Sequence, residues 1–105
     1  YRCGFEQEQS FSNEFNFHTR PQDQEHWNVR IAVFGDMGLI NGQSFPFLKQ
    51  QASKNAYDAI FHVGDFAYDL HTKNGLFGDL FMTEIEPIAA NIAYQVVVGN
   101  HENDG

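Results

Sequence analysis

The chain is poor in cysteine, in basic side chains and in long hydrophobic runs, and each shortage excludes a class of protein. Its one cysteine, Cys3, excludes an internal disulfide framework and a cysteine-rich zinc site within this stretch. Cys3 either pairs with a cysteine outside the segment or is buried as a small apolar residue. No apolar run approaches the roughly 20 residues that span a bilayer. Residues 1–10 lack the pattern of a signal peptide, so we expect any targeting signal outside this segment.

The charge is strongly negative, because fourteen acidic side chains face six basic ones and give a net charge of -8. Such a chain repels nucleic acid and anionic membranes unless it binds cations, so we expect neither as a partner. Chemistry on a phosphate ester would therefore require metal ions. The hydrophobic content of 42%, with 15% aromatic residues, indicates a folded domain rather than a disordered tail.

The first 28 residues predict the end of a β domain and a linker. Apolar and polar residues alternate from Phe11 to Thr19, which predicts a half-buried strand. Residues 1–3 are its expected hairpin partner, with residues 4–10 as the turn. Because an isolated hairpin is marginal in water, residues 1–20 are predicted to be the trailing strands of a β domain. Residues 21–28 are polar and predict a linker, in which Trp27 packs onto the domain that follows.

From residue 29 the pattern predicts an α/β domain. Apolar runs at 31–34, 59–63 and 94–98 are nearly continuous, as in parallel strands that are buried on both faces. The pair Ser44 and Pro46 predicts the start of a helix. A second helix is expected at about 77–91, where Pro87 should kink it or end one helix and begin another. The βαβαβ order implies right-handed crossovers and a sheet covered by helices. Three strands with two crossovers leave sheet edges and faces unpaired, so we expect an incomplete domain.

Each predicted strand ends in a glycine that is closely followed by a potential metal ligand. The three loops are Gly35-Asp36-Met37-Gly38, Gly64-Asp65-Phe66-Ala67-Tyr68 and Gly99-Asn100-His101-Glu102. Parallel strands present their carboxyl ends at one edge of a sheet, so these side chains should converge. Carboxylate and amide oxygens are hard donors, and a phenol of pKa about 10 ionises at neutral pH only beside a strong Lewis acid. Asp65, on the middle strand if neighbours are sequential, is the natural bridge between two metals.

In this order and spacing the three loops resemble the metallophosphoesterases, and specifically the purple acid phosphatases. Most of that superfamily has Asp-x-His in the first motif, whereas Gly38 stands in place of the histidine here. Purple acid phosphatases make this departure and supply a tyrosine in the second motif, as Tyr68 does. The resemblance implies that residues 29–105 are the amino-terminal part of a truncated catalytic domain. It also implies that residues 1–20 end a fibronectin-like domain and that three further histidine ligands are lacking.

The resemblance further implies a dinuclear acid phosphatase whose substrate is a phosphate monoester. Ferric iron would be held by Asp36, Asp65 and Tyr68. A second ion, Fe²⁺, Zn²⁺ or Mn²⁺, would share Asp65 and be held by Asn100. His101 would contact the phosphate or donate a proton to the leaving alcohol, or alternatively only orient a neighbouring group. The family also implies a secreted or lysosomal location, while the oligomeric state is left open.

Other interpretations remain for these residues. Gly-Asp pairs are common in turns, and Tyr68 could simply pack against the following helix. The chain could belong to another metallophosphoesterase, such as a phosphodiesterase, or hold a cation without turnover. His62 lies inside a strand and is expected to be a hydrogen-bonded core residue. Solvated loop carboxylates need no special role, so Glu102 and Asp69 stay unassigned, and so does His71.

Overall fold

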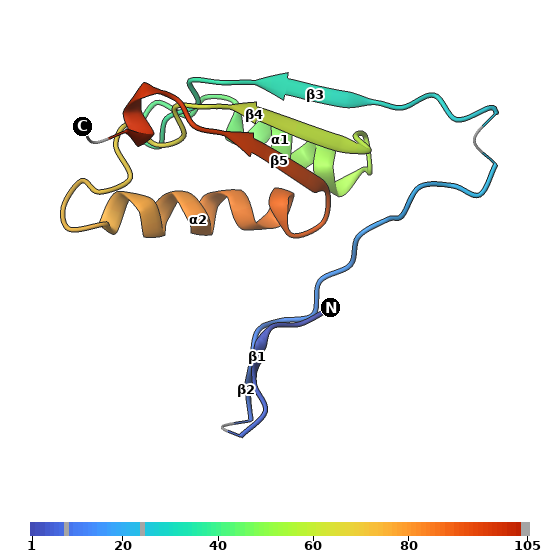
Figure 1. Cartoon of the computed structure of the whole chain (residues 1–105), viewed down its shortest axis with the longest axis horizontal. Helices are drawn as coiled ribbons and strands as arrows, with labels where there is room; N and C mark the ends of the chain where they lie inside the picture. The colour runs from blue at the N-terminus through green and yellow to red at the C-terminus, as the bar shows by residue number, and fades with distance from the viewer. Residues whose placement is uncertain (8, 24, 104–105) are drawn as a thin grey trace.

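The chain folds into a small hairpin and a three-stranded sheet that packs on two α-helices (Figure 1). The structure is a computed structural model, and it describes residues 1–7, 9–23 and 25–103. The described residues between the hairpin and the sheet form no helix or strand. The mixed α/β class predicted from the sequence is confirmed.

The hairpin consists of β1 (Gly4–Phe5) and β2 (Ser10–Phe11), which pair antiparallel. Backbone hydrogen bonds between residues 1–3 and 12–15 extend this pairing. The strand predicted for residues 11–19 is wrong in its length, because the regular strand ends at Phe11. Among the described residues, the rings of Phe15 and Phe17 pack on Tyr1 rather than on a sheet, and Phe17 stays 59% exposed.

The sheet contains β3 (Ile31–Phe34), β4 (Ala59–Val63) and β5 (Ala93–Val97), all parallel and in the order β3-β4-β5. Its register places Ile31 beside Ala59 and Ala59 beside Ala93. The three predicted strands are confirmed to within one residue. The order also makes β4 the middle strand, so the loop that follows β4 has neighbours on both sides.

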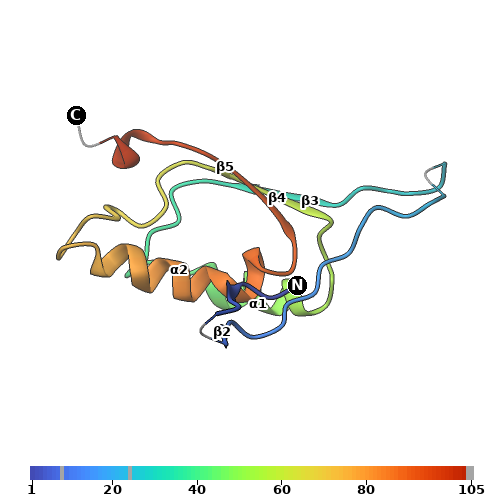
Figure 2. The ribbon, with the colours of Figure 1, turned by 60° about the horizontal axis from the view of Figure 1, so that its bottom comes forward.

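Both helices, α1 (Phe45–Ser53) and α2 (Leu76–Ala89), lie on the same face of the sheet (Figure 2). Successive right-handed crossovers that step in one direction across a sheet place every helix on one side. Ser44 precedes α1 as predicted, but its side chain makes no capping hydrogen bond. Of the two outcomes predicted for Pro87, the division into two helices is wrong, because α2 is one helix that continues to Ala89. Pro87 removes only its own backbone donor and lies in the last turn, and the predicted kink stays a prediction.

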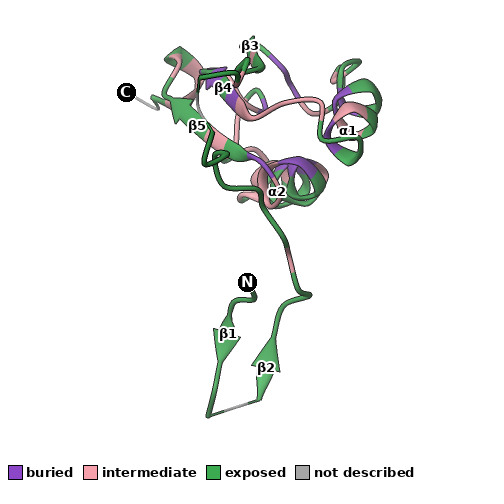
Figure 3. Cartoon of the chain, turned by 90° about the vertical axis from the view of Figure 1, so that its right-hand side faces the viewer, coloured by how far each residue is buried: buried purple, intermediate pink, exposed green. Residues whose placement is uncertain are grey.

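The core lies between the sheet and the helices, where the residues coloured as buried in Figure 3 gather. Ile60 of β4 and Ile88 of α2 are fully buried at its centre. The other buried apolar side chains come from both helices, from the loops after β3 and β4, and from Ile92 just before β5. This packing holds the loops after β3 and β4 against the helices.

The opposite face of the sheet is bare. Five apolar side chains on it are 40% to 64% exposed: Ile31, Val33, Phe61, Val63 and Val97. The prediction that the strands are buried on both faces is therefore wrong for this chain. Sequence periodicity showed that both faces are apolar, but it could not show that both helices cover the same one.

Two features raised by the composition can be compared with the structure. Cys3 is an exposed free thiol, so the expectation that it is buried as a small apolar residue is wrong. Its pairing with a cysteine outside this segment stays a prediction. Among the described residues, neither α-helix has the length and apolar character that crossing a membrane requires.

Candidate metal centre

The loops that follow β3 and β4 run side by side at the carboxyl edge of the sheet. Backbone N–H groups of the first loop donate to carbonyl oxygens of the second at 2.9 to 3.2 Å, from Asp36 to Gly64, from Met37 to Asp65 and from Gly38 to Phe66. This ladder continues the parallel pairing beyond the strands. The first two sequence motifs are therefore held in a fixed register before any ligand binds.

The loops after β4 and β5 approach too closely for side chains. Gly64 has a φ of +85°, and a Cβ atom there would lie 2.6 Å from the Cα of Gly99. A Cβ atom on Gly99 would lie 2.1 Å from Oδ1 of Asp65. Glycine permits both the positive φ and the contact. Gly64 and Gly99, which precede the predicted ligands in the sequence, thus allow the second and third motifs to come together.

Tyr68 and Asp36 form the first pair of predicted ligands. The Tyr68 hydroxyl donates a hydrogen bond to Oδ1 of Asp36 at 2.7 Å. This bond favours the neutral phenol and raises the pKa of Tyr68 to about 12. Both residues have positive φ, +46° and +53°, an uncommon conformation for residues with a side chain. Two hard oxygen donors therefore meet around one proton, and a bound cation is the group that would displace it.

The ring of Tyr68 lies over Gly38, the residue at which the first motif has no histidine. Gly38 has a φ of +70°, and a Cβ atom there would lie 3.5 Å from a carbon of that ring. A larger side chain at position 38 would have to share this space with the tyrosine. The glycine in the first motif and the tyrosine in the second are thus a matched pair in space.

His101 lies beside these groups and is held at both ends. Its backbone N–H donates to Oδ1 of Asp65 at 3.0 Å, and its Nδ1 lies 2.5 Å from Oδ1 of Asp69. The hydrogen bond with Asp69 raises the pKa of His101 above its ordinary value. The rings of His101 and Tyr68 are 4.4 Å apart. Sequence reasoning left Asp69 unassigned, and no spacing rule would have connected it with His101.

Asn100 is brought to the same edge but is not joined to the other predicted ligands. It begins the short helix η1 (Asn100–Glu102) and is exposed, and its side chain makes no hydrogen bond in the described part of the chain. Across residues 1–7, 9–23 and 25–103, no three His, Cys, Asp or Glu side chains gather closely enough to hold an ion. The oxygen donors present fit part of a metal centre, with tyrosine among them, but do not surround an ion completely.

Glu102 is the residue that sequence reasoning missed. Its carboxylate accepts hydrogen bonds at 2.8 Å from the backbone N–H groups of Asp65, Phe66 and Gly99. Burial by itself would raise the pKa of Glu102, but these three bonds together hold the pKa below its ordinary value. A signal was present, since a glutamate three residues after a helix-capping position often reaches back to the capping N–H. Gly99 and Glu102 have that spacing.

His62 is a core residue, as predicted. Its side chain is fully buried among aromatic rings, and Nδ1 lies 2.8 Å from the hydroxyl of Tyr94. Nε2 has no hydrogen-bond partner in the structure. Burial lowers the pKa of His62, so the neutral ring is favoured. It lies beneath the loops rather than among the candidate ligands.

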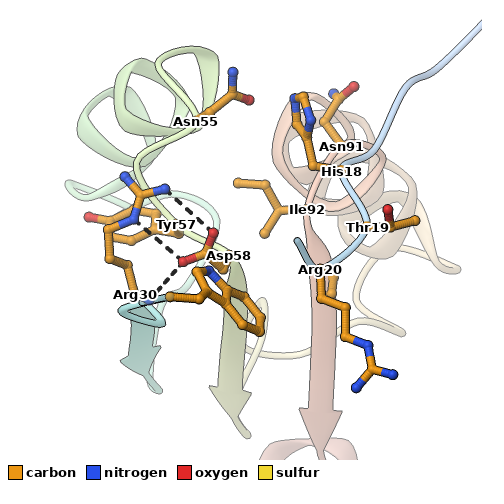
Figure 4. A pocket seen from close by; sticks show the side chains of 11 residues that line it. His18, Thr19, Arg20, Arg30, Asn55, Tyr57, Asp58, Asn91 and Ile92 are labelled. Atoms are coloured by element: carbon orange, nitrogen blue, oxygen red, sulfur yellow. Dashed lines mark hydrogen bonds and ion pairs between the residues drawn. The ribbon is translucent and has the colours of Figure 1, made fainter. Parts of the chain in front are cut away.

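Two cavities of similar volume lie at opposite ends of the sheet. One of about 410 Å³ borders Asp36 and Tyr68. The other, of about 430 Å³, lies at the amino ends of the strands (Figure 4). Trp27 of the linker is among the residues that line it. Within that second cavity Arg30 and Asp58 are joined by hydrogen bonds (Figure 4), and the bond from the Arg30 backbone lowers the pKa of Asp58. Because the carboxylate of Asp58 is already paired with Arg30, the amino end lacks the open set of oxygen donors found at the carboxyl end.

Comparison with known proteins gives the same assignment as the loops. No protein-family model matches the chain. The chain is 45% identical over 102 residues to acid phosphatase type 7 of Mus musculus and of Homo sapiens. The matched region is 97% of this chain but only 23% of those proteins. A protein of Arabidopsis thaliana named "Probable inactive purple acid phosphatase 1" is 34% identical over 88% of this chain and 17% of its own length. A "Nucleotide pyrophosphatase/phosphodiesterase" of Hordeum vulgare is 34% identical over 86% of this chain and 27% of its own.

A solved structure is also similar, that of a purple acid phosphatase from yellow lupin seeds. It superposes with a TM-score of 0.57 and 32% sequence identity over 73% of this chain and 15% of that chain. The segment thus spans only part of its curated relatives, 23% of the mammalian proteins, 17% of the Arabidopsis protein and 27% of the barley protein. Over the part that it covers, sequence and fold agree, and the chain belongs to the purple acid phosphatase family.

Proposed function

We propose that this chain is part of an acid phosphatase that hydrolyses phosphate monoesters at a dinuclear metal centre. Its mammalian relatives are named acid phosphatases, and the chain spans 23% of their length. The activity therefore belongs to the full-length protein, by which we mean this segment together with the remainder of a family member. By the same resemblance we place that protein in a secreted or lysosomal compartment.

The observation that carries the proposal is the pair formed by Tyr68 and Asp36. The phenol oxygen lies 2.7 Å from the Asp36 carboxylate, and its ring covers Gly38, where other metallophosphoesterases have a histidine ligand. A tyrosine without a metal would gain little from pointing an exposed hydroxyl at an exposed carboxylate in a conformation that is uncommon for both residues. A trivalent cation would use both oxygens.

The residues present suggest how the centre is divided. Asp36, Asp65 and Tyr68 would hold ferric iron, and Asp65 with Asn100 would hold a divalent ion, Fe²⁺, Zn²⁺ or Mn²⁺. When bound, two such ions acidify water and offset charge on the attacking and leaving oxygens of the phosphate. Tyr68 would serve as an anionic ligand once its phenol proton is lost.

His101 would act on the substrate rather than on the metals. Its Nδ1 is engaged by Asp69, which leaves Nε2 as the nitrogen that can face the substrate. The raised pKa favours the protonated ring, which suits donation of a proton from Nε2 to the leaving alcohol. Asp69 would fix the ring orientation and stabilise its positive charge.

We also propose that this segment holds only part of the ligand set of the metal centre. The side chains present give three donors for one ion and two for the other, and the family's further histidine ligands are not among them. The 105-residue chain alone should therefore show negligible turnover of p-nitrophenyl phosphate. Robust metal-dependent turnover by the isolated chain would refute this part of the proposal.

The proposal as a whole is tested on the full-length protein by elemental analysis and by turnover of p-nitrophenyl phosphate. Two metal ions per chain, one of them iron, together with monoesterase activity are the expected result. A purified protein that holds metal but hydrolyses no monoester would overturn it.

Two other functions are suggested by the names of relatives. The barley relative is named a nucleotide pyrophosphatase and phosphodiesterase, so diester hydrolysis is the second candidate. A higher kcat/KM for bis(p-nitrophenyl) phosphate than for the monoester would favour it. Several Arabidopsis relatives are named probable inactive enzymes, and a metal-loaded protein without turnover of either substrate would place this chain with them.

A further inference from the structure

Glu102 joins two of the three loops through their backbones. One carboxylate oxygen accepts N–H groups from Asp65 and from Gly99, and the other accepts the N–H of Phe66, all at 2.8 Å. Asp65 and Phe66 follow β4, whereas Gly99 and Glu102 follow β5. A single side chain thus bridges segments 36 residues apart in sequence.

The bridge is reciprocal. While Glu102 accepts the N–H of Asp65, the Asp65 carboxylate accepts the N–H of His101 from the loop that carries Glu102. Each loop therefore holds the other through one side chain and one backbone group. At Gly64 and Gly99 the two backbones are too close to admit a Cβ atom, so the loops already lie in contact where these hydrogen bonds join them.

We propose that Glu102 is a positioning residue, which fixes the Asp65 carboxylate and the His101 ring relative to one another by clamping the loops after β4 and β5. It does not touch the substrate. Hydrogen bonds to an ionised carboxylate are stronger than those between neutral groups, and this one satisfies N–H groups that would otherwise lack partners in the turns. The catalytic meaning of the clamp rests on the proposed phosphatase function, whereas its effect on the loops does not.

The clamp can be tested by hydrogen exchange in the metal-free full-length protein. Glu102→Gln replaces one acceptor oxygen with an NH₂ group, which cannot accept the N–H that faces it. Glu102→Ala removes both acceptors. Loss of charge-assisted hydrogen bonds of this kind should speed exchange at the amides of Asp65, Phe66 and Gly99 by about 10- to 100-fold, and more in the alanine variant than in the glutamine variant.

Glu86→Gln is the matched control, because Glu86 is an exposed acidic residue of α2 with no side-chain hydrogen bond in the described structure, and its change removes the same charge. Faster exchange confined to the two loops, graded from glutamine to alanine and absent in the control, supports the clamp. Unchanged exchange in both Glu102 variants would overturn it. So would an equal increase throughout β4, β5 and α2, because that pattern indicates only a general loss of stability.

Metal content and steady-state kinetics connect the clamp to the reaction. In an active full-length protein, Glu102→Gln should lower kcat with a smaller change in KM, since substrate contacts remain while the working groups lose their alignment. Unchanged kcat with loosened loops would overturn the positioning role. A wild-type protein without metal or turnover would instead refute the proposed function, and the exchange data would still decide whether the clamp exists.

Discussion

The two ends of the β3-β4-β5 sheet both carry acidic side chains, but they balance charge in different ways. At the amino end, Asp58 is paired with Arg30 through backbone and side-chain hydrogen bonds. At the carboxyl end, acidic side chains accept from backbone N–H groups, a phenol and a histidine, and none forms an ion pair with Lys or Arg in the described part of the chain. The two cavities have similar volumes, and the ends differ in whether their carboxylates are paired with a cationic side chain. Under the proposed function, a bound cation would balance the charge at the carboxyl end.

Replacing a histidine at each end should give the largest contrast in activity. In the full-length protein, His101→Ala should lower kcat by about 100- to 10,000-fold while both metals are retained, because it removes a proton donor or a phosphate contact. His18→Ala changes an exposed histidine that lines the amino-end cavity and should leave turnover unchanged. Loss of both metals from the His101 variant, measured by elemental analysis, would make it a structural or ligating residue instead.

Tyrosines at the two ends provide a spectroscopic contrast. If the Tyr68 phenolate binds ferric iron, charge transfer between them should colour the full-length protein purple, and Tyr68→Phe should abolish the colour and weaken iron binding. Folding should survive, because the ring is retained and only one oxygen is removed. Tyr57→Phe, which alters the amino-end cavity, should leave the visible spectrum unchanged. A Tyr68→Phe protein that stays purple with full iron would mean that another tyrosine is the ligand.

The pH dependence of the free energy of unfolding should reveal the protonation of His62, the buried histidine of β4. Because burial lowers the pKa of His62, the unfolded chain takes up a proton that the folded chain resists. This contribution to stability is complete above the ordinary histidine pKa of about 6.5 and is lost as the pH falls below it, by at most about 1.4 kcal/mol per pH unit for one group.

Urea unfolding of the metal-free full-length protein at several pH values would measure this slope. His62→Gln should flatten it between about pH 6.5 and lower pH, where only the unfolded histidine is protonated. His18→Gln, at an exposed histidine, should not. Equal slopes in wild type and the His62 variant would show that other groups dominate the acid lability.

The ion pair at the amino end should matter least. Asp58→Asn keeps an acceptor for the Arg30 backbone but removes the charge, so it should lower the free energy of unfolding by about 0.2–1 kcal/mol and leave kcat unchanged. High salt should shrink the difference between variant and wild type, since an exposed pair is screened. A drop in kcat would show that the two ends are coupled.

The strands, their order and the convergence of the three loops followed from the sequence, because apolar runs and strand-ending glycines have direct physical meanings. Glu102 could have been found from its spacing to Gly99, which is that of a capping residue. The link between Asp69 and His101 could not, since their meeting depends on how two loops pack across 32 residues. The sequence indicated that sheet faces stay uncovered in this segment, but not which face, because periodicity reports which residues are apolar and not what covers them.

That bare face has a practical consequence for anyone who produces this segment by itself. Its exposed valines, isoleucine and phenylalanine extend across all three strands. The two edge strands, β3 and β5, have outer backbone groups that lack a neighbouring strand in the described structure. An apolar face beside open edges favours self-association. Preparations of the isolated chain should therefore scatter light increasingly with concentration and bind dyes that fluoresce on apolar surfaces, and a solubilising fusion partner would be needed to keep it in solution.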